Sequence, residues 1–92
     1  MGIVEDLKKL GFEHWDTGGN CTALVKVLPT GQHFVVTDKG GLEYPTETDW
    51  WISLYTNEDW LPEGARKIGS QSSNWPLCRA AICKTLGVVW AN

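Results

Sequence analysis

The 92-residue sequence has no long apolar run, which excludes a membrane-spanning helix. Such a helix needs about 20 consecutive, mostly apolar residues. The N-terminal segment is also a poor secretion signal, because Glu5 and Asp6 stand where such a signal carries basic residues. No membrane association is expected from these features, and we predict a cytoplasmic protein.

Cysteine is scarce, and its number is odd. Three cysteines without an export signal indicate reduced thiols in a reducing compartment and argue against a disulfide framework. Cys21, Cys78 and Cys83 could bind zinc together with a histidine. However, residues 78 and 83 of a helix point about 140° apart, which does not suit a metal site. We therefore expect neither a metal nor another cofactor.

Basic residues are few and dispersed, which makes nucleic acid an unlikely principal partner. Residues 64–92 contain four cations and no acid, and these cations are Arg66, Lys67, Arg79 and Lys84. Residues 38–63 contain seven acids against Lys39 alone, within a net charge of −3. This acidic segment either attracts a basic partner or forms a solvated loop surface.

Length and composition predict a single folded domain over residues 1–92, because 42% of the residues are apolar and 21% are charged. Apolar spacing predicts a helix over 3–10 that ends at Gly11. A second helix is predicted over 75–86, with Ser73 or Asn74 as its N-cap and Gly87 as its end. Its expected apolar face comprises Leu77, Ala81, Ile82, Thr85 and Leu86.

Three segments rich in β-branched or aromatic residues predict strands, and an alternating stretch over 12–16 could add a fourth. The three strong candidates are residues 21–28, 32–37 and 50–56. The glycine- and serine-containing segment 61–74 is interpreted mostly as a loop. Short connections favour an α+β fold in which a three- to four-stranded antiparallel meander has both helices packed on one face.

Six tryptophans are unusually many for so short a chain. Trp50 and Trp51 are adjacent, so on a strand they point to opposite faces. We expect Trp50 in the core and Trp51 with Tyr55 on the open face, unless the segment 57–74 covers them. An exposed aromatic patch of this kind indicates binding of a protein partner or homodimerisation. The predicted partner-binding residues are Asp49, Trp51, Tyr55, Glu58, Asp59 and Trp60.

A cysteine after a glycine turn also allows a second hypothesis. Cys21 follows Gly18-Gly19-Asn20, a position in which some thiol enzymes carry their nucleophile. His14 or His33 could then act as the base of a small cysteine hydrolase. The structural alternative is that Cys21 is a small buried apolar residue beside a tight turn.

The stretch LGFEHWDTGGNCTALVKVLPTGQHFVVTD, residues 10–38, resembles small bacteriophage-encoded proteins with a Gly-Gly-x-Cys-x-Ala-Leu turn and strand followed by a hairpin. Proteins of this kind are mostly of unknown function. The resemblance implies a non-enzymatic accessory protein that acts in the host cytoplasm by binding, and thereby inhibiting, a host or defence protein. It implies no catalytic residue.

Overall fold

The computed structural model describes residues 2–18, 21–56 and 64–90. Within these ranges the chain forms two helices and five strands. In chain order they are α1 (Ile3–Lys9), β1 (Glu13–Gly18), β2 (Cys21–Val27), β3 (His33–Thr37), β4 (Trp51–Tyr55), β5 (Ala65–Ser70) and α2 (Trp75–Leu86). None of the helices in the described part of the chain is long and apolar enough to cross a membrane.

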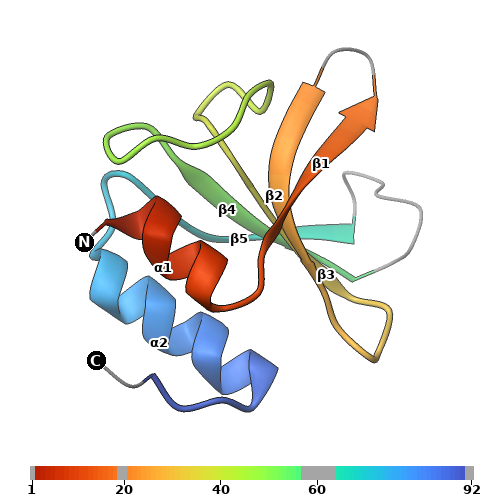
Figure 1. The fold of residues 1–92 in the computed structure, drawn as a ribbon, viewed down its shortest axis with the longest axis vertical. Helices are drawn as coiled ribbons and strands as arrows, with labels where there is room; N and C mark the ends of the chain where they lie inside the picture. The colour runs from red at the N-terminus through yellow and green to blue at the C-terminus, as the bar shows by residue number, and fades with distance from the viewer. Residues whose placement is uncertain (1, 19–20, 57–63, 91–92) are drawn as a thin grey trace.

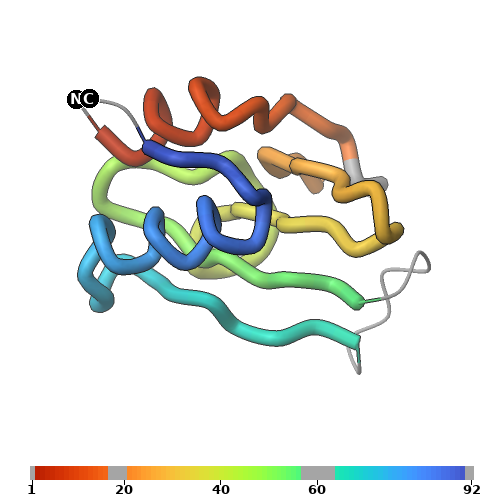
Figure 2. The backbone as a smooth tube through the Cα atoms, turned by 90° about the horizontal axis from the view of Figure 1, so that it is seen from below, coloured from red at the N-terminus to blue at the C-terminus, as the bar shows by residue number. Residues whose placement is uncertain are grey.

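The strands form one antiparallel sheet in the order β1-β2-β3-β4-β5, and both helices lie on the same face of it (Figure 1). Figure 2 shows α2 running alongside β5, the strand that it contacts more than any other. The predicted α+β meander is therefore confirmed, but the expected number of three to four strands was wrong.

β5 is the strand that the sequence did not predict. Its residues 65–70 fall within the segment 61–74, which glycine and serine content marks as a loop. The strand forms because β4 offers it a full antiparallel partner, from Tyr55↔Ala65 to Trp51↔Ser70. Long-range pairing overrides the weak local β-propensity of these residues.

Three helix ends follow the predicted capping chemistry. Gly11 has a φ of 94°, and the amide of Phe12 donates to the carbonyl of Leu7, as in a Schellman ending. The side chain of Asn74 accepts from the amide of Leu77, and Gly87 ends α2 with a φ of 74°.

The predicted apolar face of α2 was partly wrong. Leu77 is 70% exposed, and Ala81 and Thr85 are also exposed. The buried residues of α2 are Cys78, Ile82 and Cys83, with Leu86 partly buried against the core. The helix turns Cys78 toward the sheet because Gly69 of β5 leaves room there: a Cβ at Gly69 would overlap the Cys78 sulfur.

Alternation along the strands separates two apolar layers. The larger lies between the sheet and the helices, and its fully buried members are Leu7, Leu24, Phe34, Val36, Ile52 and Ile82. Trp50 and Leu54 also belong to it, as predicted. A smaller cluster of Ala23, Val25 and Val35 is buried on the other face, where Tyr55 packs against it. We call this second face the helix-free face.

The connection between β3 and β4 caps α1 from a distance. The Glu47 carboxylate accepts from the amides of Ile3, at 2.7 Å, and Val4, at 3.1 Å. These amides have no partner inside the helix, and Gly2 at the N-cap has no side chain to offer them. Glu47 therefore replaces a local N-cap and ties the β3–β4 connection to α1.

A buried carboxylate joins the two helices. Asp6 is 5% exposed, and its Oδ2 accepts from Trp75 Nε1 at 2.8 Å and from Arg79 Nη1 at 3.0 Å. The Trp75 ring in turn packs edge-on against Trp50 in the core, with 5.6 Å between ring centroids. Asp6 thus fixes α2 relative to α1 and to the core beneath them.

Replacing Asp6 by Ala is expected to destabilise the protein by about 2 to 4 kcal/mol. The change leaves the Trp75 N–H and the partly buried Arg79 guanidinium without their acceptor. Chemical denaturation monitored by tryptophan fluorescence gives the free energy of unfolding. Glu5→Ala is the matched control, because the Glu5 carboxylate is exposed to solvent, where an ion pair such as that with Lys9 contributes little. Equal losses in the two variants would contradict the assigned role of Asp6.

Replacing Gly69 by Ala is expected to destabilise the protein by about 1 to 3 kcal/mol, because the new methyl group overlaps the Cys78 sulfur. A second change, Cys78→Ala, should restore part of that loss because it removes the overlapping atom. A double-mutant cycle of thermal or chemical denaturation measures the coupling. Additive effects of the two substitutions would show that the Gly69–Cys78 contact does not limit the packing of α2.

Candidate functional site

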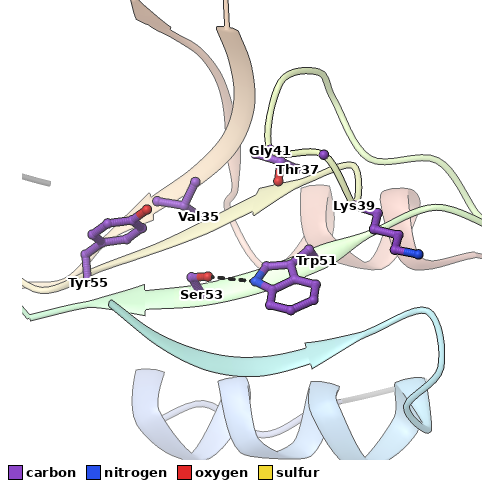
Figure 3. Close-up of a pocket in the computed structure, with 8 residues that line it drawn as sticks. Val35, Thr37, Lys39, Gly41, Trp51, Ser53 and Tyr55 are labelled. Carbon is purple, nitrogen blue, oxygen red and sulfur yellow. Dashed lines mark hydrogen bonds between the residues drawn. The ribbon is translucent and has the colours of Figure 1, made fainter. Parts of the chain in front are cut away.

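The helix-free face is hollowed beside the small apolar cluster. The hollow has a volume of about 270 Å³ and is lined by Val35, Thr37, Lys39, Gly40, Gly41, Trp51, Ser53 and Tyr55. Figure 3 shows Tyr55 at one end and Trp51 with Lys39 at the other. We refer to it as the Trp51–Tyr55 hollow.

Strand register explains why these side chains meet. Trp51, Ser53 and Tyr55 alternate along β4 and therefore point to the same face. Across the sheet, Ser53 is paired with Val35 on β3 and with Lys67 on β5. The register shifts between Ile52↔Gly69 and Ser53↔Lys67, so that Ile68 is an extra residue of β5. This irregularity lets Ile68 pack on the core while Lys67 stays on the helix-free face.

Two polar contacts hold the Trp51 ring in place. Its Nε1 donates to the Ser53 hydroxyl at 3.1 Å, the contact drawn in Figure 3. The Lys67 ammonium lies over the ring, 4.3 Å from its centroid. The indole is half-buried, so it is pre-organised but still reachable from solvent.

Tyr55 is held at the opposite end of the hollow. Its ring stacks on His33, with centroids 5.4 Å apart and an interplanar angle of 1°. His33 itself is only 2% exposed. Trp51 and Tyr55 are four residues apart on one strand, a distance of about 13 Å at the usual rise. The hollow therefore has the length of three or four residues of extended peptide.

The turn over residues 38–41 forms the rim near Trp51. Gly41 has a φ of 76°, a conformation that favours glycine, and its amide donates to the Asp38 carbonyl. The Asp49 carboxylate accepts from the amide of Lys39 at 2.7 Å. Asp38 Oδ1 accepts from the amides of Leu42 and Glu43. The backbone of the turn is thus held, whereas the Lys39 side chain remains exposed.

The structure brings together part of the predicted partner-binding set. Trp51 and Tyr55 lie on the helix-free face, as expected, and line the same hollow. Asp49 lies in the neighbouring β3–β4 connection, where its carboxylate serves the backbone of Lys39. Glu58, Asp59 and Trp60 lie outside the described residues, as do the other residues of 57–63. The remainder of the segment 57–74, which could have covered the patch, is described, and its residues 65–70 form β5 beside β4.

Sequence analysis missed Lys39 and Ser53, which line the hollow, and Lys67, which lies over the Trp51 ring. Lys67 was hidden because its strand was interpreted as a loop. Lys39 was counted only as the single cation of an acidic segment, although Asp38, Glu47 and Asp49 of that segment bind backbone amides. Ser53 did carry a signal, since it is the polar residue between Trp51 and Tyr55 on their own face of β4.

The residues of the hydrolase hypothesis lie apart. Cys21 begins β2, whereas His33 pairs with Val27 at the other end of that strand. Six residues of β-strand separate the two positions by about 20 Å. His14 pairs with Leu24, three positions from Cys21, and its ring contacts Tyr44. A general base needs hydrogen-bond reach of its nucleophile, and this arrangement gives neither histidine that reach.

The other two cysteines belong to the interior. Cys78 and Cys83 are buried thiols on α2. Burial raises the pKa of the Cys78 thiol, an effect that the nearby Lys67 charge and a hydrogen bond with Ser73 partly offset. In the described parts of the chain, no three His, Cys, Asp or Glu side chains gather as the ligands of a metal would.

Comparison of the chain with protein-family models, with curated proteins and with solved structures finds no match. The function must therefore be inferred from the geometry of the hollow and its surroundings.

Alkylation should distinguish the three thiols. Cys21 is half-buried, whereas Cys78 and Cys83 are buried and Cys78 has a raised pKa. Iodoacetamide at about pH 8 is expected to modify Cys21 first, because alkylation requires an accessible thiolate. The other two thiols should react only after denaturation, which peptide mass spectrometry can follow over time. Modification of Cys78 at the same rate as Cys21 would contradict this burial pattern.

Proposed function

We propose that this protein acts by binding another protein through its helix-free face, with the Trp51–Tyr55 hollow at the centre of the contact. The observation that carries the proposal is the placement of two half-buried aromatic rings around a hollow on the face that the helices leave uncovered. Aromatic residues concentrate binding energy at protein interfaces, above all where they flank a preformed depression.

Pre-organisation of the rings favours binding. The Ser53 hydroxyl and the Lys67 ammonium hold Trp51, and His33 holds Tyr55. Rings that are already ordered lose little side-chain entropy when a partner arrives. A merely solvated surface would need none of these contacts.

The proposed role is non-enzymatic. The separation of Cys21 from both histidines supports binding over thiol catalysis, because a cysteine hydrolase requires a base beside its nucleophile. The resemblance of residues 10–38 to bacteriophage-encoded proteins adds a class of target. A bacterial host or defence protein would be inhibited when this small protein occupies its surface.

Trp51→Ala should weaken binding strongly while leaving the fold largely intact. Truncation of an interface aromatic costs roughly 2 kcal/mol or more of binding free energy, about a thirtyfold loss of affinity. The cost in unfolding free energy should stay below about 2 kcal/mol for Trp51, against about 3 to 5 kcal/mol for Trp50→Ala in the core. Partners captured from bacterial lysate by the immobilised protein would be purified, and their affinities measured. Self-association would be measured by sedimentation velocity.

Two further variants sharpen the test. Leu77→Ala removes an exposed apolar side chain from the opposite side of the molecule, so it should keep every specific partner. Ser53→Leu fills the floor of the hollow and should lose the partner even if Trp51→Ala proves poorly folded. Unchanged capture, affinity and sedimentation in well-folded Trp51→Ala and Ser53→Leu proteins would overturn the proposal.

A further inference from the structure

Charge at the Trp51 end of the hollow points to the chemistry of the partner. Lys39 lies on its rim, and the Lys67 ammonium lies over the Trp51 ring. In the described part of the chain, neither lysine forms an ion pair, since the pairs found there are Lys9–Glu5 and Arg79–Asp6. Two cations therefore border a half-buried aromatic ring on a protein whose net charge is −3.

The nearest carboxylates of the β3–β4 connection are directed at backbone amides. Asp49 accepts from the amide of Lys39, and Asp38 accepts from the amides of Leu42 and Glu43. These hydrogen bonds use Oδ1 of each carboxylate and hold the rim in shape. The acidic segment around Lys39 thus supports the rim of the hollow, and Lys39 is the one charged side chain among the described residues that line it.

We infer that the occupant of the hollow is a short, extended acidic segment of the partner protein, an inference that rests on the proposed binding function. A carboxylate of that segment lies between Lys39 and Lys67, where it meets both ammonium groups. An apolar side chain two or more residues away lies over Val35 and against Tyr55. The length of about 13 Å between the two aromatic residues matches such a segment.

Nucleic acid fits the same surface less well. Phosphate binding needs a continuous basic surface, whereas the remaining cations of residues 64–92 are dispersed over other surfaces. Arg79 binds Asp6 and lies over Trp90, Lys84 is on α2, and Arg66 is paired with Leu54, whose side chain faces the helices. In addition, Lys67 lies over the Trp51 ring and His33 over the Tyr55 ring, so neither ring offers both faces to a base.

Selection from a library of random displayed hexapeptides tests the inference without a known partner. Peptides retained by the wild-type protein but not by Trp51→Ala define the hollow-dependent set. We expect this set to be enriched in Asp and Glu beside an apolar residue. The variant Lys39→Glu/Lys67→Glu, in which both charges are reversed, should bind synthetic versions of these peptides at least about tenfold more weakly. In the same selection, this variant should retain peptides enriched in Lys or Arg.

The matched control is Lys8→Glu/Lys9→Glu, which makes the same charge change on exposed residues of α1. It should keep both the acidic enrichment and the affinities. Hollow-dependent peptides without acidic enrichment, or an enrichment that survives reversal of Lys39 and Lys67, would overturn this inference and leave the proposed binding function standing. Absence of any Trp51-dependent peptide would overturn the inference too, and the lysate experiment would then decide the proposed function separately.

A DNA-binding measurement tests whether nucleic acid occupies the hollow instead. Binding of a fluorescent 15-nucleotide single-stranded DNA is measured with the wild-type protein and with Trp51→Ala. We expect no Trp51-dependent binding at physiological salt. Trp51-dependent binding with a steep salt dependence would assign the hollow to nucleic acid and would overturn the acidic-peptide inference.

Discussion

The Asp6 carboxylate is the interaction on which the arrangement of the helices depends. It is buried between α1 and α2 and accepts from both Trp75 and Arg79. A buried carboxylate is unfavourable unless its acceptor atoms are satisfied, so the position of α2 relative to α1 is narrowly defined. Because Trp75 also packs on Trp50, the Asp6–Trp75 hydrogen bond also fixes the position of α2 relative to the sheet. Both helices are consequently held on one face, and neither helix covers the other face.

Because both helices pack on one face, the helix-free face can present a hollow lined by aromatic side chains. Its inner part buries Ala23, Val25 and Val35, which gives the sheet a second, smaller apolar layer. Beside that layer, Trp51 and Tyr55 are held by neighbouring polar and aromatic groups without being fully covered. The result is a shaped surface of ordered rings with cations at one end. Such a surface suits recognition of a partner. Its aromatic rings are already ordered before the partner binds, so binding costs little side-chain entropy. Its charge favours partners of complementary charge.

The β3–β4 connection shows how acidic residues serve the fold. Glu47 caps α1, whereas Asp38 and Asp49 hold the turn that forms the rim of the hollow. From the sequence alone, these residues are interpreted either as a binding surface for a basic partner or as a solvated loop surface. Their hydrogen bonds to amides instead link the first helix, the connection and the candidate site. The composition of a segment therefore does not reveal the electrostatic character of the surface that it helps to build.

Local chemistry in the sequence determined both helices, because Gly11, Asn74 and Gly87 supply end geometries that few other residues adopt so easily. Period-two alternation likewise determined which faces of β3 and β4 enter the core, and it placed Trp51 and Tyr55 together on the opposite face. The core face of β2 stayed open between Leu24 and Val25, and both residues are buried, on opposite faces. Tertiary structure alone decided the rest. β5 exists because β4 pairs with it, and Cys78 faces the sheet because Gly69 makes room for it. Lys39 lines the hollow and Lys67 lies over the Trp51 ring because a turn and a strand, distant in sequence, lie on either side of β4. No local pattern carries that information, since contacts between distant segments depend on packing and register.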